Sequence, residues 1–310
     1  MYKNYLTTLE NVNETLEKYG VAVIPNIITD DECEQYKLSI WNSIHSIYNP
    51  FSFDDQTSWN SFYNLMPLHS MLIQYYSIGH IQGVWDIRSH VNLGNVFSKI
   101  HGTNDLLTSF DGISIALPPE KTGRGWYKGN DWLHTDQSPK NKSFCIQGLV
   151  NLYDVHEGDA TLSILEGSHK YHAQLFETFG KTTYKDDWYK LEPEEKSFLS
   201  KHCQQYCVLA PKGSIILWNS KTFHQGIESQ KTREKENFRM AIYTCLRPKS
   251  QFNNAMIKKR QKAFQESRLT NHWGTHLFSK HPRTYGNDLP ITESVPLPLL
   301  SDYGKSLIPL

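Results

Sequence analysis

The spacing of apolar residues changes at about residue 105, from the 3.6-residue period of a helix to the two-residue period of a strand. Several of the alternating segments are bounded by Gly, Pro or Asn, which commonly flank strands. The predicted strands are 107–117, 131–136, 143–153, 160–165, 205–210, 214–219 and 238–246. Short strands with helical segments before and after them predict an α+β fold built around an antiparallel sandwich or barrel.

Helical patterns occupy both sides of this β-rich region. The sequence predicts helices at 7–18, from Thr29 to about Tyr48, across 80–100 and at 251–268. A short strand is expected at 21–24, and 281–310 is expected to be an extended, Pro-containing tail on the surface. No internal repeat or linker divides the chain. We therefore expect one domain over 1–310, with a mainly helical support (1–104), a β core (105–247) and a C-terminal helix and tail (248–310).

Charge and composition exclude several classes of protein. Lys plus Arg equals Asp plus Glu at 32 each, so no positive field points to nucleic acid or to an anionic membrane as a partner. No apolar stretch approaches the roughly 20 residues of a membrane span, and polar residues follow Met1–Tyr5 where a signal peptide would be apolar. Five scattered cysteines do not form a disulfide framework. We expect a cytoplasmic protein that acts on a small molecule, and the sequence leaves its oligomeric state open.

The sharpest chemical signal is His134-Thr135-Asp136 in the second predicted strand. Alternate side chains of a strand point to the same face, so His134 and Asp136 project together. A third candidate ligand, His224, follows the apolar strand 214–219. An isolated His-x-Asp pair occurs often by chance, but two His and one carboxylate form the facial triad of non-haem Fe(II) oxygenases, which leaves coordination positions open.

A 2-oxo acid could occupy these open positions through its keto oxygen and nearer carboxylate, and its far carboxylate would then need a cation. Arg239 lies on a predicted strand, on the face opposite Met240 and Ile242. A guanidinium inside a barrel needs an anionic partner, and its planar fork suits a carboxylate. A surface Arg on an edge strand is the alternative. Arg233, in a charged loop, is expected to be solvated.

Other polar residues have weaker signals. Gln147 and Asn151 could place amides beside the metal, or could equally belong to a polar network with the backbone. His272, His276 and His281 include a pair four residues apart, but no carboxylate completes a site, so we expect them to have a packing or surface role.

Four motifs in order resemble the phytanoyl-CoA dioxygenase-like branch of the Fe(II)/2-oxoglutarate-dependent oxygenases. They are the opening strand and helix over 20–33, Leu133-His134-Thr135-Asp136-Gln137, the turn, strand and Gly-Ser-His segment over 157–170, and the strand Pro211–Trp218 that leads to His224. The resemblance covers roughly residues 18–247. It implies a double-stranded β-helix, which is a jelly-roll or cupin-like barrel, with flanking helices and with iron at its open end.

The resemblance also implies roles for single residues, and it gives His169 a turn-capping role rather than metal binding. His134, Asp136 and His224 would hold Fe(II), Arg239 would anchor 2-oxoglutarate, and O2 would take the last position. Members often have a Ser two residues after the distal His, where this chain has Gly226, so Thr222 or Ser229 is a candidate substitute. The interval from His224 to Arg239 is longer than usual, which the charged insertion 230–236 explains.

The function implied is a dioxygenase that decarboxylates 2-oxoglutarate to succinate and hydroxylates a C–H bond of a substrate that the sequence does not identify. The carboxylate of Asp136 favours hydroxylation, since halogenating relatives have a small residue there. Two other functions stay open. One is a binding or scaffold protein that keeps the barrel without turnover. The other is a metal-dependent hydrolase or isomerase on a cupin-like barrel, which would need more His ligands and no Arg.

Overall fold

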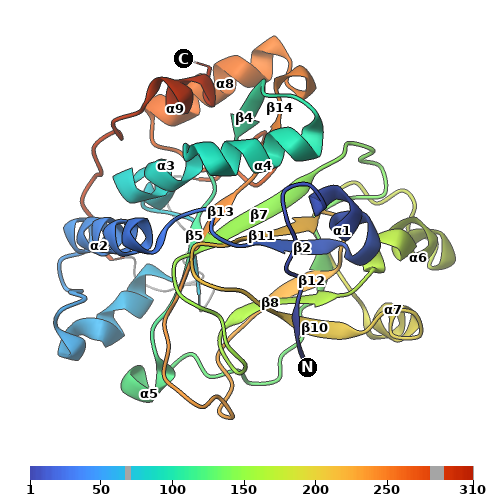
Figure 1. Ribbon diagram of the computed structural model, residues 1–310, viewed down its shortest axis with the longest axis horizontal. Helices are drawn as coiled ribbons and strands as arrows, with labels where there is room; N and C mark the ends of the chain where they lie inside the picture. Colours follow the sequence, from blue (N-terminus) through green and yellow to red (C-terminus); the bar gives the residue numbers. More distant parts are fainter. Residues whose placement is uncertain (67–70, 280–289, 310) are drawn as a thin grey trace.

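Two six-stranded sheets form the centre of the computed structural model, which describes residues 1–66, 71–279 and 290–309 (Figure 1). The first sheet has the strand order β1-β10-β8-β12-β6-β9, and the second has the order β2-β11-β7-β13-β5-β3. Neighbouring strands are antiparallel except β1, which runs parallel to β10. A separate pair, β14 and β4, is also antiparallel.

The elements have the following bounds. The strands are β1 (Tyr2–Asn4), β2 (Val21–Ile24), β3 (Leu72–Ile73), β4 (Leu106–Thr108), β5 (Ile113–Ala116), β6 (His134–Thr135), β7 (Ile146–Asn151), β8 (Thr161–Leu165), β9 (Tyr189–Lys190), β10 (Gln205–Leu209), β11 (Ile215–Asn219), β12 (His224–Ile227), β13 (Arg239–Thr244) and β14 (Leu246–Pro248). The α-helices are α1 (Val12–Tyr19), α2 (Asp30–Ile47), α3 (Gln82–Arg88), α4 (Val91–His101), α5 (Pro119–Thr122), α6 (His172–Thr178), α7 (Pro193–Leu199), α8 (Asn254–Gln265) and α9 (Asp302–Ser306).

Alternation along the strands of the second sheet separates two apolar cores. In β11, Ile215 and Leu217 pack with the N-terminal helices, whereas Ile216 and Trp218 point to the first sheet. The outer core includes side chains from Val12 through Leu307 and is covered by helices α1 to α4, which lie along this sheet in Figure 1. The inner core lies between the two sheets. Side chains of odd-numbered residues in β7 and β13 therefore share the inner space, because the side-chain period of a strand is two.

Local sequence accounts for the N-terminal elements. Gly20 ends α1 in the left-handed conformation, with φ of 75°, and its backbone N–H donates to the Leu16 carbonyl. Thr29 begins α2 with a capping box, in which its hydroxyl accepts from the Glu32 N–H and the Glu32 carboxylate accepts from the Thr29 N–H. The predicted helix from Thr29 to about Tyr48 is confirmed within a residue at each end.

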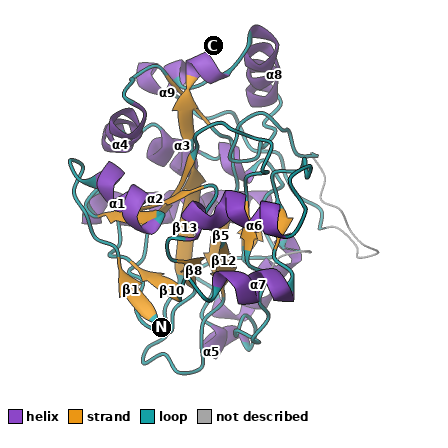
Figure 2. Ribbon diagram, turned by 90° about the vertical axis from the view of Figure 1, so that its right-hand side faces the viewer, coloured by secondary structure: helices purple, strands orange, loops and turns teal. Residues whose placement is uncertain are grey.

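Several elements differ from the sequence prediction. The segment 107–117 breaks into β4 and β5, and 238–246 breaks into β13 and β14, whereas the helical region expected over roughly 80–100 is present as α3 and α4. The alternating pattern did not predict β12, which carries two polar side chains and a glycine, or the segment with α6, β9 and α7. Helices α6 and α7 lie together beside the first sheet (Figure 2). Tertiary pairing therefore determined these elements.

The C-terminal tail is only partly extended. Residues 281–289 lie outside the described residues, and 290–300 have no regular structure. The surface tail predicted for 281–310 is wrong for its end, because α9 forms there and Leu307 and Ile308 are buried, with Leu307 in the outer core. Among the residues that the structure describes, no helix combines the length and apolar character needed to cross a membrane.

Candidate metal centre

Three side chains predicted to bind metal lie together at one end of the space between the sheets. His134 on β6 is directly opposite His224 on β12, and Asp136 follows β6 by one residue. The Asp136 carboxylate lies 3.7 Å from Nε2 of His134 and 3.2 Å from Nε2 of His224. One ligand atom from each residue lies within 4.8 Å of the others, so the three could hold one metal ion.

Hydrogen bonds fix the orientation of the two imidazoles. Nδ1 of His134 lies 3.2 Å from the Trp132 carbonyl, and Nδ1 of His224 lies 2.9 Å from the Thr222 carbonyl. A carbonyl accepts only, so each Nδ1 carries the proton and each Nε2 presents its lone pair to the centre. This is the tautomer that a metal ligand requires.

The electrostatics of the centre suit a cation. Burial opposes ionisation of Asp136, but the neighbouring His134, His272 and His224 hold the pKa of its carboxyl well below the ordinary value. Burial, together with the proximity of His224, lowers the pKa of His134 to about 4. At neutral pH the site therefore offers an ionised carboxylate and a neutral His134 imidazole, the forms that bind iron.

Gln147 supports the carboxylate from the neighbouring sheet. Its amide nitrogen donates to Oδ2 of Asp136 over 2.9 Å. The prediction that this amide lies beside the metal centre thus agrees with its position. The second predicted amide, Asn151, lies on the same face four residues further along β7, but its nitrogen donates to the carbonyls of Tyr153 and Pro211. Asn151 therefore belongs to a polar network with the backbone, which was the alternative left open by the sequence.

Replacing Gln147 with leucine is expected to weaken metal binding about 10- to 100-fold, because groups that hydrogen-bond a metal ligand typically contribute that factor. Titration of the metal-free protein with Fe(II) under anaerobic conditions measures the change. Asn151→Leu is the matched control: it should lower thermal stability and leave metal affinity unaltered. Equal metal affinity in Gln147→Leu and the wild type would show that Asp136 is held by its other contacts.

Arg239 points into the same inner space from β13. It is buried, its Nε donates to the Ser114 hydroxyl over 3.1 Å and Nη1 donates to the Ala160 carbonyl over 3.2 Å. Burial lowers the pKa of its guanidinium, and the hydroxyl of Tyr243 is a further polar neighbour. Among the described residues no carboxylate forms an ion pair with it. A buried guanidinium with only neutral partners is suited to an anionic ligand.

The hydroxyl groups proposed from sequence to assist Arg239 lie elsewhere. The Thr222 hydroxyl donates to the Gly20 carbonyl, and the Ser229 hydroxyl accepts from Arg233. The prediction that Thr222 contacts the cosubstrate is therefore wrong, because the turn before β12 directs its side chain towards the end of α1. Ser114 supplies the hydroxyl instead. The sequence analysis missed Ser114, although it lies within the predicted strand 107–117.

Tyr243 was also missed, although strand alternation could have identified it. It lies four residues after Arg239 on the same strand, so the two side chains share a face. Its hydroxyl is a polar neighbour of Arg239 and Ser114, and burial raises its pKa, so it remains a neutral phenol. Arg239, Ser114 and Tyr243 together form a positively charged, hydroxyl-rich group inside the barrel.

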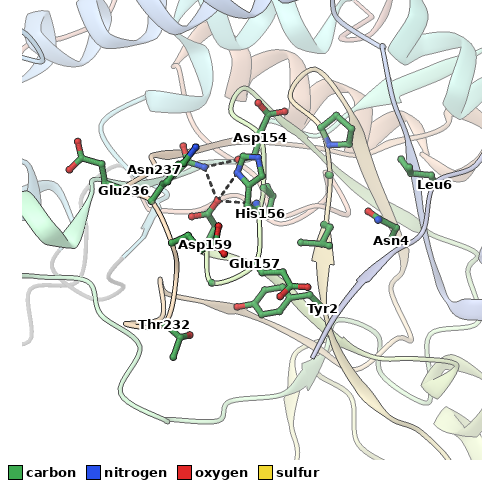
Figure 3. Close-up of a pocket in the computed structure, with 17 residues that line it drawn as sticks. Tyr2, Asn4, Leu6, Asp154, His156, Glu157, Asp159, Thr232, Glu236 and Asn237 are labelled. Atoms are coloured by element: carbon green, nitrogen blue, oxygen red, sulfur yellow. Dashed lines mark hydrogen bonds and ion pairs between the residues drawn. The ribbon is translucent and has the colours of Figure 1, made fainter.

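Arg233 is not solvated, contrary to the sequence prediction. Its side chain is 2% exposed and forms ion pairs with Glu120 and Asp159. Asp159 also accepts from Asn237, as Figure 3 shows at the edge of a cavity of about 930 Å³. That cavity contains no residue of the metal centre and lies where β7 and β10 end. Arg233 thus anchors the charged insertion 230–236 to the barrel, and the carboxylates of Glu120 and Asp159 neutralise its charge.

Replacing Arg233 with alanine is expected to destabilise the fold by about 3 kcal/mol, because it leaves the buried Asp159 carboxylate without its cation. The measurement is the free energy of unfolding in urea. Arg124→Ala is the control, since Arg124 lies over the Tyr63 ring and has no carboxylate partner among the ion pairs of the described residues. A loss below about 0.5 kcal/mol for Arg233→Ala would contradict the structural role.

His272 lies beside the metal centre, whereas its sequence pattern indicated packing or the surface. It interacts electrostatically with Asp136, Asp187 and His224, and burial lowers the pKa of its imidazole. His276 is exposed, as that prediction allowed, and His281 lies outside the described residues. His169 bonds the Glu17 carbonyl, in agreement with a structural role. No local signal could have distinguished His272, because its position depends on how the loop after α8 folds back.

Aromatic rings border the metal ligands. The indole of Trp132 stacks on the His134 ring with centroids 4.7 Å apart, and the ring of Trp188 lies 5.7 Å from it. Both indoles are partly exposed, at 37% and 51%. On the inner side, Trp218 packs against His224 at 5.4 Å. The centre is thus shielded on several sides by aromatic surface, with part of that surface exposed.

No protein-family model matches the chain. Among curated proteins, it is 23% identical over 278 residues to "Ava biosynthesis cluster protein O" of Aspergillus versicolor, covering 85% of this chain and 87% of that protein. It is 24% identical over 289 residues to a Dictyostelium discoideum protein named "Putative phytanoyl-CoA dioxygenase", covering 81% and 79%.

Solved structures share the fold. A hypothetical protein, JW0805, of Escherichia coli aligns with a TM-score of 0.64 at 11% identity, covering 99% of this chain and 85% of that one. The non-haem α-ketoglutarate-dependent carbocyclase SnoK from nogalamycin biosynthesis aligns with a TM-score of 0.51 at 14% identity, covering 77% and 85%. The similarity in sequence to the Dictyostelium protein, the shared fold and the His-Asp-His site confirm the resemblance inferred from the motifs.

Proposed function

We propose that this phytanoyl-CoA dioxygenase-like chain is an Fe(II)- and 2-oxoglutarate-dependent dioxygenase that hydroxylates a C–H bond. One observation carries the proposal: a His-Asp-His triad and a buried Arg239, which has no carboxylate partner in the described part of the chain, face the same inner space. His134, Asp136 and His224 would hold the iron. Arg239, with Ser114 and Tyr243, would bind the far carboxylate of 2-oxoglutarate.

The core supports a double-stranded β-helix. From β5 to β13, each step of the chain crosses from one sheet to the other, except that β8, β9 and β10 follow one another in the first sheet. This order encloses the inner space between two antiparallel sheets. The outer core joins residues of the N-terminal helices, the strands and the C-terminal end, which supports the prediction of one domain over 1–310.

Each residue contributes to the reaction in a definite way. Iron with 2-oxoglutarate and O2 supplies the oxidising chemistry when bound. Asp136 provides negative charge to the cation, and Gln147 holds its carboxylate in place. Arg239 fixes the far end of the cosubstrate, so that its keto acid end lies at the open positions of the triad. The buried position of His134 and His224 limits access of water to the centre.

The carboxylate of Asp136 favours hydroxylation over halogenation, because it fills the position that a halide would need. The intact triad argues against a scaffold protein. The inward Arg239 argues against a cupin-type hydrolase, which would have no use for a cation at that place. The substrate is proposed to be a small molecule or a side chain that reaches the metal past Trp132 and Trp188.

The test is turnover of 2-oxoglutarate by the iron-loaded protein. We expect succinate and CO2 in equal amounts, slowly without a substrate and faster with one. A screen of small metabolites for a 2-oxoglutarate-dependent gain of one oxygen would then identify the substrate. Absence of both 2-oxoglutarate binding and succinate formation in the iron-loaded wild type would refute the proposed function.

A further inference from the structure

The loop after α8 is fixed against the segment that carries the metal ligands. The Trp273 indole N–H donates to the backbone carbonyl of Asp136 over 3.1 Å, and Nη1 of Arg247 donates to the Trp273 carbonyl over 2.8 Å. The Trp273 ring also packs with Cys145 and Cys245 in a small buried cluster. His272, the residue before this indole, therefore has a defined place beside the centre.

The His272 imidazole lies among the ligands and their neighbours. Its ring centroid is 5.4 Å from that of Trp273, whose indole donates to the Asp136 carbonyl, and the neighbouring Asp136, Asp187 and His224 influence the pKa of its imidazole. Asp187 is itself held by the backbone N–H of Ser138 over 3.0 Å. Three segments that are distant in sequence thus meet around His272 at the metal end of the barrel.

Nε2 of His272 is shielded from solvent and has no hydrogen-bond partner among the described residues. A buried polar nitrogen without a partner is unfavourable, and a bound ligand, water or ion, or a catalytic role, is what commonly explains such an atom in a native protein. Other metal-centre side chains have partners: Gln147 bonds Asp136, and Arg239 bonds Ser114. Among the described residues around this centre, His272 Nε2 and the indole nitrogen of Trp218, which packs against His224, are buried nitrogens with a hydrogen bond left to make.

The chemistry of the cosubstrate decides which bond this is. The far carboxylate of 2-oxoglutarate is assigned to Arg239, so its keto and nearer carboxylate oxygens lie at the triad. These oxygens accept hydrogen bonds and do not donate them. A neutral imidazole has one N–H donor, which matches such an acceptor.

We propose that His272 is a further cosubstrate-binding residue, and that its Nε2–H donates to an oxygen at the metal-chelating end of 2-oxoglutarate. This inference rests on the proposed function. His272 and Arg239 then hold opposite ends of one molecule: Arg239 provides charge for the far carboxylate, and His272 orients the chelating end relative to the ligands.

The experiment is an anaerobic calorimetric titration of the Fe(II)-loaded, full-length protein with 2-oxoglutarate and, separately, with pyruvate. Pyruvate has the chelating end without the far carboxylate. His272→Ala is expected to weaken binding of both probes by about 10- to 100-fold, the effect of losing a hydrogen bond to a charged acceptor. Arg239→Ala should weaken binding of 2-oxoglutarate alone. Metal content should stay unchanged in both variants.

Two further variants separate a bond to the ligand from a structural effect. His272→Asn retains a donor and should recover part of the affinity. His276→Ala is the matched control, because His276 is an exposed imidazole in the same loop, and it should bind both probes as the wild type does.

The outcomes distinguish the two proposals. If the wild type binds no 2-oxoglutarate, the proposed function fails. If the wild type binds it and His272→Ala binds both probes equally well, the inference about His272 is overturned and the function stands. Loss of iron from His272→Ala, with no recovery in His272→Asn, would also overturn it, since His272 would then act on the metal site itself.

Discussion

Replacing Asp136 with alanine is expected to abolish metal binding and, with it, turnover of 2-oxoglutarate. The change removes the only carboxylate of the triad and leaves only its two imidazoles, and it frees the Gln147 amide that now bonds Asp136. Stabilisation by a bound metal is worth several kcal/mol in the transition state, so succinate formation should fall by about 1,000-fold or more. Metal analysis after dialysis and a succinate assay measure the two effects.

His134→Ala should also abolish metal binding and turnover of 2-oxoglutarate, because it removes an imidazole nitrogen of the triad. His169→Ala is the control: this imidazole bonds the Glu17 carbonyl, away from the triad. It should retain iron and succinate formation at wild-type levels. Stoichiometric iron in Asp136→Ala would mean that other residues hold the metal.

Replacing Arg239 with alanine is expected to weaken 2-oxoglutarate binding by roughly 30- to several-thousand-fold, which corresponds to about 2–5 kcal/mol. The reason is that the far carboxylate would remain buried among Ser114, Tyr243 and apolar side chains without its cation. Iron should still bind, because Arg239 forms no contact with the triad among its hydrogen bonds. Calorimetry of the iron-loaded variant measures the loss.

Variants at the same group sharpen this test. Arg239→Lys should recover only part of the affinity, because an ammonium replaces a bidentate fork. Tyr243→Phe should cost less than Arg239→Ala, since it removes one neutral hydroxyl. Arg233→Ala should lower stability and leave the affinity of the folded protein unchanged. Equal losses of affinity at Arg233 and Arg239 would show that the anchor has been misassigned.

The charged loop shows how a local pattern can mislead. Arg233 lies among six consecutive polar residues and is surrounded in sequence by Lys and Glu, which is typical of a solvated turn. The fold nevertheless buries it between Glu120 and Asp159, which are 113 and 74 residues away. Because the charge of Arg233 is neutralised, Arg239 is the inward-facing arginine of the barrel with no carboxylate partner among the described residues, and it is the candidate to bind an anionic ligand.

The sequence by itself identified the three candidate metal ligands. His134 and Asp136 are separated by one residue, so any extended backbone directs them to one side, and His224 follows an apolar strand that must be buried. It also determined the face of Arg239, because the apolar Met240 and Ile242 must point to the outer core. The faces of these side chains follow from the period of a strand and from which side chains avoid water, and their roles follow from the resemblance of the four motifs.

The tertiary structure alone decided which polar groups complete the centre. Gln147 reaches Asp136 from another sheet, Ser114 reaches Arg239 from the strand paired with it, and His272 arrives on a loop more than 130 residues after Asp136. Thr222 was nearer in sequence to the ligands and points away. Which groups become hydrogen-bond partners depends on the register of the strands and on how distant segments of the chain come together. The type of a side chain specifies neither of these.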